Sequence, residues 1–482
     1  MSPRGDDDVL DSSAAGGVVI RGSALRVAGF VAGTAISVAA SAVLLRYLGV
    51  IGAGRYTTVI SLLAIVAGLT DAGLANIGIR EFSARTGTSR DQFMRDILGL
   101  RLALTLAGVT LATAFAVVAG YTGPMVAGTL AGGAGLFFIV LYGTFAIPLN
   151  ARLRLGAVTL LELLRNALSA VLLAGLALAG ASLLALLAVP LPVGLALVLA
   201  AYPLVRRDMA WRPSISIRRW GELMRELLPY AVATAVGFLY VYLTVIVLGL
   251  VASEREVGIF SVAFRVFIVL GGASSLLAQA AFPVLARAAR DDADRLAYGT
   301  QRLLEGSFVV AALAGLGTAF AAPVAIEVIA GGGGFEDAVG VLELQAVAFA
   351  GTFPAAVGAF AVLAQGRYVA VLVVNAAALV VSLGTTLALG TAEGAAVANI
   401  AGELTLLAGY LIALVTGPER IDLRLGLAPR IGLAAAAGVA AGLVAPGPSV
   451  VRTAAALGVF GVVVVLVRGV PDEIHHALLG RV

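Results

Sequence analysis

Long apolar segments recur along the chain from residue 24 to residue 468, and short polar turns separate them. As a helix, an apolar segment of about 20 residues crosses the roughly 30 Å hydrocarbon core of a bilayer. About fourteen spans are predicted, at 24–45, 57–79, 98–120, 124–149, 155–180, 182–204, 226–251, 257–284, 307–330, 337–364, 367–389, 395–416, 429–446 and 449–468. The alternating pattern of a membrane barrel does not occur in the sequence. The pattern therefore predicts an all-α polytopic membrane protein.

Composition supports lipid as the solvent, because only 12% of the residues are charged and 60% are hydrophobic. Soluble proteins carry about a quarter charged residues. The absence of cysteine excludes thiol catalysis and disulfides, and the absence of lysine excludes a Walker A nucleotide site. Both histidines, His475 and His476, lie near the carboxyl terminus, so no metal site and no cofactor is expected within the membrane.

The arginines set the predicted orientation. With the amino terminus inside, 26 of them fall in cytoplasmic tails, loops and span ends. Four fall on the opposite side and two within spans: Arg46, Arg55, Arg255 and Arg452, and then Arg165 and Arg265. By the positive-inside rule, both termini are cytoplasmic.

The longest polar connection follows the sixth span and contains six arginines. Because six spans precede it and at least six follow it, it is predicted to link two lobes. It suits an amphipathic segment on anionic membrane lipids, and nothing in it resembles a nucleic-acid-binding module. The predicted parts are a disordered cytoplasmic tail (1–23), a six-helix lobe (24–204), the amphipathic linker (205–225), a second six-helix lobe (226–416), a cytoplasmic loop (417–428), a further helix pair (429–468) and a cytoplasmic tail (469–482).

The two lobes share a short sequence pattern. "YLGVIGAGRYTTVISLL" (47–63) and "LGLVASEREVGIFSVAFRV" (248–266) each contain Leu-Gly, a short outer turn and then Gly-x-aromatic at the start of a helix. Six spans preserve orientation, so the lobes are predicted to be pseudo-symmetric parallel repeats. Such repeats place a binding site between them near the membrane midplane.

At these residues the chain resembles the Wzx-type flippases, the polysaccharide-transporter branch of the multidrug/oligosaccharidyl-lipid/polysaccharide (MOP) exporter superfamily. The resemblance rests on "LGVIGAGRY" (48–56), "DAGLANIGIR" (71–80), "TVIVLGLVASEREVGIFSVAFRV" (244–266) and "AAFPVLAR" (280–287). Thr244 stands where similar proteins have aspartate, and Phe260 where they have tyrosine. The threonine puts in doubt any cation or proton role that this aspartate carries.

The resemblance implies a V-shaped pair of lobes around a polar cavity, with the helix pair 429–468 appended. It implies alternating access that moves a lipid-linked oligosaccharide from the cytoplasmic to the outer leaflet. A monomer in a prokaryotic plasma membrane is expected, and no enzymatic or catalytic residue is.

Charges within spans are expensive in lipid and mark candidate site residues. Arg265 and Arg165 belong to different lobes, and a guanidinium binds phosphate oxygens through parallel hydrogen bonds. For Arg165 a structural pair with Glu162, three residues earlier, is the main alternative. Arg26 and Arg80 are further candidates for the cavity.

The remaining candidates are acids and tyrosines. Asp71, Glu343 and Glu403, with Glu162, are candidates for coupling to protons or sodium, or for packing against arginines and hydroxyls. Tyr240 and Tyr242 are deep enough to line a cavity, but they are two positions apart on a helix and cannot share a face.

Three other functions stay open beside the flippase. A cation-coupled multidrug antiporter of the same superfamily would be expected to have a carboxylate-rich cavity. A membrane-embedded sugar polymerase or ligase generally needs a large outer loop, and the outer loops here are short. A membrane scaffold would not need arginines within spans.

Overall fold

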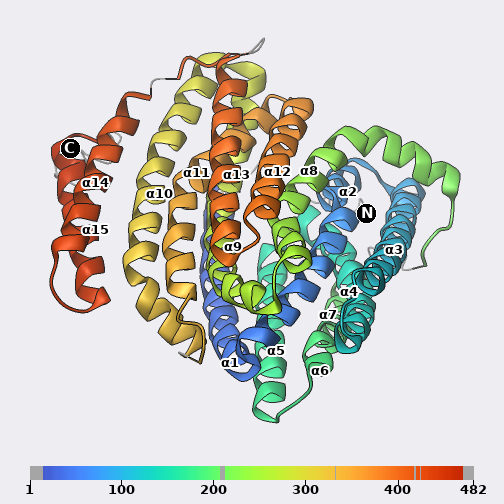
Figure 1. The fold of residues 1–482 in the computed structure, drawn as a ribbon. Coiled ribbons are helices and arrows are strands. Elements are labelled where there is room, and N and C mark those ends of the chain that lie inside the picture. The colour runs from blue at the N-terminus through green and yellow to red at the C-terminus, as the bar shows by residue number, and fades with distance from the viewer. Residues whose placement is uncertain (1–14, 207–211, 332, 417–419, 424, 470–482) are drawn as a thin grey trace. The chain divides into compact units, whose positions relative to one another are not determined.

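The computed structural model describes residues 15–206, 212–331, 333–416, 420–423 and 425–469 (Figure 1). Every regular element in those ranges is helical. By length and composition, twelve helical segments there are long and apolar enough to cross a membrane, and Ala428–Val444 is a shorter apolar helix. Because the first of these segments contains two predicted spans, the predicted all-α architecture of about fourteen spans is confirmed.

The chain divides by its contacts into two compact units. The first contains the described residues up to Leu44 together with Gly73–Arg225. The second contains Leu45–Ala72 and the described residues from Glu226 onward. The second predicted span therefore packs mainly with the later helices, although it precedes the linker in the sequence.

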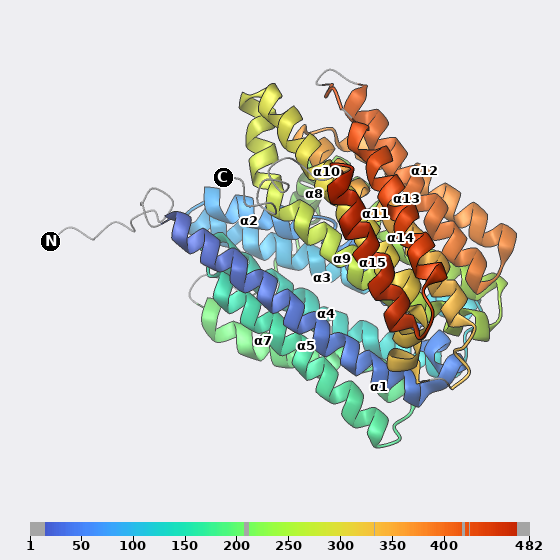
Figure 2. The ribbon, with the colours of Figure 1, turned by 90° about the vertical axis from the view of Figure 1, so that its left-hand side faces the viewer.

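The first unit contains the amino-terminal part of α1 (Ala15–Asp71) and the following helices: α2 (Leu74–Ala84), α3 (Gly87–Val118), α4 (Gly123–Ala151), α5 (Leu155–Leu178), α6 (Leu183–Leu187) and α7 (Pro190–Val205). Figure 2 shows α1 running along α5. Their approach is close, because a Cβ at Gly29 would overlap Thr159 and one at Gly33 would overlap Asn166. Small residues allow such backbone proximity within a membrane.

The second unit contains the rest of α1 and the later helices: α8 (Ile217–Val251) from Glu226 onward, α9 (Glu254–Asp291), α10 (Ala293–Ala330), α11 (Ala338–Ala364), α12 (Tyr368–Leu389), α13 (Ala392–Val415), the short 3₁₀ helix η2 (Leu425–Leu427), α14 (Ala428–Val444) and α15 (Ser449–Leu466). Phe260 and Phe335 are fully buried in its core. The additional pair α14–α15 packs beside α10 (Figure 1), where Gly442 contacts the ring of Phe320.

Two breaks interrupt the long first helix. At Gly49 the backbone takes φ 62° and ψ −178°, which separates the first two predicted spans. Ala72 and Gly73 then have φ values of 32° and 82°, so the predicted continuous span 57–79 ends at Asp71 and resumes as α2. Glycine tolerates this left-handed conformation, which explains a break that hydropathy alone does not reveal.

The predicted tails fall partly outside the described residues. Residues 1–14 and 470–482, including His475 and His476, are not among them. Residues 15–23 were expected to be disordered, and that expectation is wrong, because α1 begins at Ala15. The apolar stretch Val18–Ile20 continues the helix toward the amino terminus.

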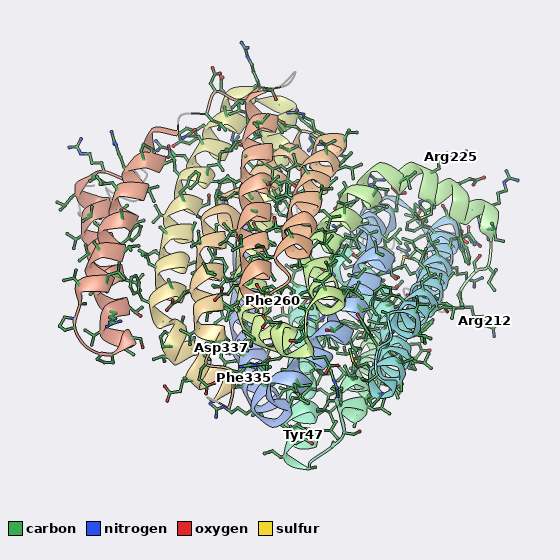
Figure 3. The ribbon with its side chains drawn as sticks, in the orientation of Figure 1. Tyr47, Arg212, Arg225, Phe260, Phe335 and Asp337 are labelled. Carbon is green, nitrogen blue, oxygen red and sulfur yellow. The ribbon has the colours of Figure 1, made fainter. Side chains whose placement is uncertain are left out.

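The described part of the linker is attached to the first unit. Arg219 of α8 forms a salt bridge of 3.0 Å with Asp96 of α3, and the Ser214 amide donates to the Arg95 carbonyl at 3.1 Å. The Trp220 ring contacts α3 at Gly99. Figure 3 marks Arg212 and Arg225, which bound this segment. Because α8 is continuous to Val251, one helix leads from the docked linker into the second unit.

Candidate functional site

Arg265 lies in the first third of α9, within the second unit. It is eleven residues from the start of the helix at Glu254, or about 17 Å along the axis. Its side chain is half-buried, and the hydroxyls of Tyr56 and Tyr242 are close enough to interact with it electrostatically. We call Arg265, Tyr56 and Tyr242 the Arg265 site. Three helices, α1, α8 and α9, supply its residues.

The Arg265 site combines a cation with aromatic surface. Phe264 packs edge-on against the ring of Tyr242, with centroids 5.9 Å apart, and this contact helps to fix the tyrosine. A guanidinium has five donors, and each tyrosine adds a hydroxyl and an apolar ring face. These groups can bind an anionic oxygen and lie against a sugar ring.

Tyr240, the other predicted tyrosine of α8, has a different partner. Its side chain is buried, and its hydroxyl donates to Oε1 of Glu403 on α13 at 2.9 Å. The predicted separation of the two tyrosines onto different faces therefore corresponds to two different contacts.

The two repeated hairpins meet at the end of the second unit that is predicted to face outward. A Cβ at Gly54 would overlap the Glu254 carbonyl, and one at Gly258 would overlap the Val50 carbonyl. Nε of Arg55 is 2.9 Å from both carboxylate oxygens of Glu254. We call Gly54, Arg55, Glu254 and Gly258 the hairpin lock.

Further contacts close the same end of the unit. Arg255 forms a salt bridge of 2.8 Å with Asp337, which Figure 3 marks near Phe335 and Phe260. Arg46 donates to the Val328 carbonyl at 2.6 Å. The loops that join these helices are therefore held by polar contacts on top of an apolar core.

Arg165 lies in the first unit, on α5. Its side chain is exposed, whereas Glu162 is half-buried, and both interact electrostatically with the buried Tyr142. The structure describes both side chains, and no salt bridge joins them. That Arg165 shares a cavity with Arg265 stays a prediction.

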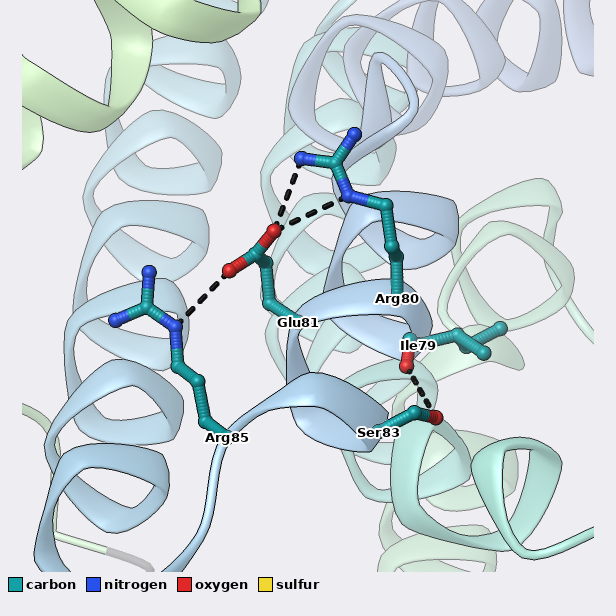
Figure 4. A network of polar contacts seen from close by, with 5 residues as sticks. All are labelled: Ile79, Arg80, Glu81, Ser83 and Arg85. Carbon is teal, nitrogen blue, oxygen red and sulfur yellow. Dashed lines mark hydrogen bonds and ion pairs between the residues drawn. The ribbon is translucent and has the colours of Figure 1, made fainter.

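Arg80 lies in an ion-pair cluster at the end of α2 (Figure 4). Its Nε and one terminal nitrogen donate to Oε1 of Glu81 at 3.1 and 2.9 Å, and Arg85 binds Oε2 at 2.9 Å. Arg80 is exposed, so in this structure its charge is paired at a helix end. Arg26 belongs to α1, but its side chain is outside the described part of the chain.

The predicted acids occupy three different environments. Asp71 is the last residue of α1, half-buried at the break before Gly73. Glu343 is exposed on α11. Glu403 is only 4% exposed, and it lies within hydrogen-bonding reach of Tyr240 and Thr352.

Two further residues, one in each unit, were not predicted as candidate site residues. Arg101, 4% exposed on α3 near Gly143, had been counted with the arginines at span ends, because it is close to the predicted start at 98. Tyr56 is the last residue of the motif "LGVIGAGRY", and the motif alone did not mark it as a site residue. Its place directly before the predicted span 57–79 is the one sequence feature that points to it.

The many helices that are long and apolar enough to cross a bilayer define a multi-pass membrane protein. The sequence profile of the family described as "Polysaccharide biosynthesis protein" matches residues 43–333, which is more than half of the 482 residues. The chain belongs to this family. No curated protein sequence matches it.

Solved transporter structures share the fold. One is described as the lipid II flippase MurJ in an inward closed conformation, with a TM-score of 0.75, 12% identity, and coverage of 96% of this chain and 100% of that chain. Another is an inward-facing multidrug resistance MATE family transporter of the MOP superfamily, with a TM-score of 0.62, 16% identity, and coverage of 81% and 96%. A eukaryotic MATE transporter matches with a TM-score of 0.60, 16% identity, and coverage of 83% and 97%. Together with the family match, this fold confirms the predicted resemblance.

Proposed function

We propose that the protein is a flippase that moves an oligosaccharide linked to a polyprenyl phosphate or pyrophosphate from the cytoplasmic to the outer leaflet. The observation that carries the proposal is the Arg265 site, in which two tyrosines from neighbouring helices lie near a guanidinium about 17 Å along a membrane helix. Membership of a polysaccharide biosynthesis family supports this class of substrate.

The energetics of an arginine within a membrane helix favour an anionic substrate. Estimates of the cost of an arginine at the bilayer midplane run from about 3 to over 10 kcal/mol. A phosphate or pyrophosphate group offsets this cost, because its oxygens accept two parallel hydrogen bonds from the guanidinium fork. The rings of Tyr56 and Tyr242 supply apolar faces for the first sugar.

Alternating access gives the hairpin lock its role in this proposal. The lock joins the turn before Tyr56 to the start of α9, and so closes the outer end above the Arg265 site. Release of substrate to the outer leaflet requires the Arg55–Glu254 ion pair and the glycine contact to separate. A half-exposed ion pair of this kind contributes only about 1 kcal/mol, so it can open repeatedly.

The remaining parts of the proposal concern location and assembly. Both termini would lie in the cytoplasm of a prokaryotic cell, as the distribution of arginines favours. The protein would work as a monomer and move its substrate without cleaving or forming covalent bonds. It would use no nucleotide, because the sequence lacks the lysine of a phosphate-binding loop.

Reconstitution tests the proposal directly. The probe is a fluorescent monosaccharide joined through pyrophosphate to a polyprenyl chain, and the measurement is how fast it becomes accessible to a membrane-impermeant quencher. Arg265→Ala should lower this rate at least about a hundredfold, because transition-state interactions of about 3 kcal/mol are lost. Arg265→Lys should restore only part of it, since an ammonium lacks the planar fork.

Arg452→Ala is the matched control, because Arg452 is an exposed arginine at the start of α15. It should leave the rate unchanged. If Arg265→Ala inserts normally and moves the probe as fast as the unmodified protein, the Arg265 site is not the substrate site.

A further inference from the structure

Glu403 is a carboxyl group buried near the middle of a membrane helix. It is eleven residues from the start of α13, or about 17 Å along the axis, and its exposed fraction is 4%. Tyr240 donates to it at 2.9 Å, and the Thr352 hydroxyl, which also reaches the Ala348 carbonyl, lies within hydrogen-bonding reach. Among the described residues no salt bridge reaches Glu403, so its contacts are neutral hydroxyl groups.

Two glycines hold this carboxyl group in place. A Cβ at Gly402 would lie 2.6 Å from the Tyr240 ring. A Cβ at Gly351 of α11 would lie 2.6 Å from the main-chain carbonyl oxygen of Glu403. The helices α8, α11 and α13 therefore approach one another closely at Glu403. The packing leaves Tyr240 directly against the carboxylate.

Burial without an opposite charge makes a carboxyl group responsive to protonation, because the ionised form loses its hydration. A proton fits this site better than a sodium ion. The Tyr240 hydroxyl already donates a proton to the Glu403 carboxylate in a hydrogen bond of 2.9 Å. Sodium would need several oxygen ligands arranged around it.

The groups that face Glu403 are few. Among the residues that the structure describes, Tyr240 from α8 and Tyr410 from its own helix are the titratable side chains close enough to interact with it. Tyr410 donates to Asn375 of α12, and α11 contributes the uncharged Thr352. The helix α9 presents Glu256 to the far end of α13, where it accepts a bond from the Ala392 amide at 2.6 Å.

Tyr240 connects this carboxyl group to the helix that continues into the linker. The same helix carries Arg219 and Trp220, which bind α3, about 30 Å along its axis. A hydrogen bond from tyrosine to a charged carboxylate is stronger than one to a neutral carboxyl group. Gain of a proton at Glu403 therefore weakens the attachment of α8 to α13.

We infer that Glu403 is the proton-binding residue that couples a proton gradient to movement of α8, and so drives the transport cycle. The inference rests on the proposed function, because it names the energy source of the same transporter. The step is the reversible addition of a proton to the Glu403 carboxylate, with the proton taken from and returned to water.

Infrared difference spectroscopy of the reconstituted full chain tests protonation without any substrate. A carbonyl-stretch band of protonated carboxyl groups should appear as the pH falls, and the component that Glu403 contributes should be missing from the Glu403→Gln spectrum. Glu393→Gln is the matched control, because Glu393 is exposed in the first turn of the same helix. Its spectrum should keep the Glu403 component. A Glu403→Gln spectrum that matches the spectrum of the unmodified protein would overturn the inference.

Tryptophan fluorescence tests the connection to α8. The chain has two tryptophans, and Trp211→Phe leaves Trp220 as the single reporter at the docked linker. Its emission should change over the same pH range as the infrared band. The change should be lost in the double variant with Glu403→Gln. Emission that is independent of pH would overturn the link between Glu403 and α8.

Transport measurements complete the test and separate the two proposals. An imposed proton gradient should accelerate movement of the pyrophosphate-linked probe about tenfold, a typical coupling energy between sites. Glu403→Gln should move it at one rate with or without the gradient. A gradient response that survives in Glu403→Gln, or one that requires sodium, would overturn the inference while the flippase function stands. If the unmodified protein moves no probe while the infrared band and the fluorescence change are present, the proposed function fails instead.

Discussion

Tyr240 and Tyr242 lie two positions apart on α8 and contact sites of opposite charge. Tyr242 interacts with the guanidinium of Arg265, whereas Tyr240 donates a hydrogen bond to the carboxylate of Glu403. The first site is half-buried and offers hydrogen-bond donors, and the second is buried and closely packed. One helix therefore contacts both a group suited to an anionic substrate and a group suited to a proton.

The comparison also explains why the two sites should respond differently to substitution. A substrate site must admit a large ligand, so a lost hydroxyl weakens binding without disturbing the fold. The packing at Glu403 leaves no space, so an added methyl group there must displace a helix.

The largest effect is expected for Gly402→Val. The new side chain would overlap the Tyr240 ring and push the tyrosine away from Glu403. Overpacking of this kind costs about 1–3 kcal/mol, and it should lower the melting temperature and abolish the response to a proton gradient. Thermal unfolding in detergent and the gradient assay measure both effects.

Gly271→Val is the control for that experiment. Gly271 lies on α9, six residues after Arg265, and a Cβ there would meet no atom within 4 Å. Its melting temperature should not change. Equal stability of the two valine variants would contradict the close packing at Glu403.

A smaller effect is expected for Tyr242→Phe. It keeps the ring and removes the hydroxyl beside Arg265, so KM for the pyrophosphate-linked probe should rise about tenfold, the size of one hydrogen bond to a charged group. The pH dependence of transport should not move. A shifted pH profile with an unchanged KM would place Tyr242 with Glu403 rather than with the substrate.

The smallest effect is expected for Tyr240→Phe, which is the mirror experiment. Loss of the hydroxyl removes a bond that favours the charged carboxylate, so the infrared band of protonated Glu403 should persist to a pH higher by about half a unit, or about 0.7 kcal/mol. KM should stay the same. If the band appears at the same pH in Tyr240→Phe, the Tyr240 hydroxyl does not stabilise the charged form of Glu403.

The fold was largely predictable, because runs of apolar residues and the distribution of arginines are local properties of the chain. The break after Asp71 was not predicted, since the positive φ values of Ala72 and Gly73 leave no trace in the hydropathy of the span. The start of α1 at Ala15 was also missed, because the short apolar stretch Val18–Ile20 lies among small and polar residues that are also typical of a tail.

Predicting the sites was harder, because their contacts are distant in sequence. Tyr240 and Glu403 were both named as candidates, but 163 positions separate them, and no pattern within one sequence joins such residues. Arg101 was assigned to a helix end by its position, whereas its burial depends on how α4 packs beside it. Position along a span does not determine the direction that a side chain takes.

The contact between Gly54 and Gly258 has a consequence for how this protein tolerates mutation. Main-chain atoms of two helices meet there without side chains between them. A larger residue at either position therefore fits only if the two helices move apart. A saturation scan should find that Gly54 and Gly258 tolerate substitution as poorly as the residues of the Arg265 site, although these glycines are not part of that site. Low tolerance in such a scan would then identify the positions where helices close against each other as well as the positions that bind substrate.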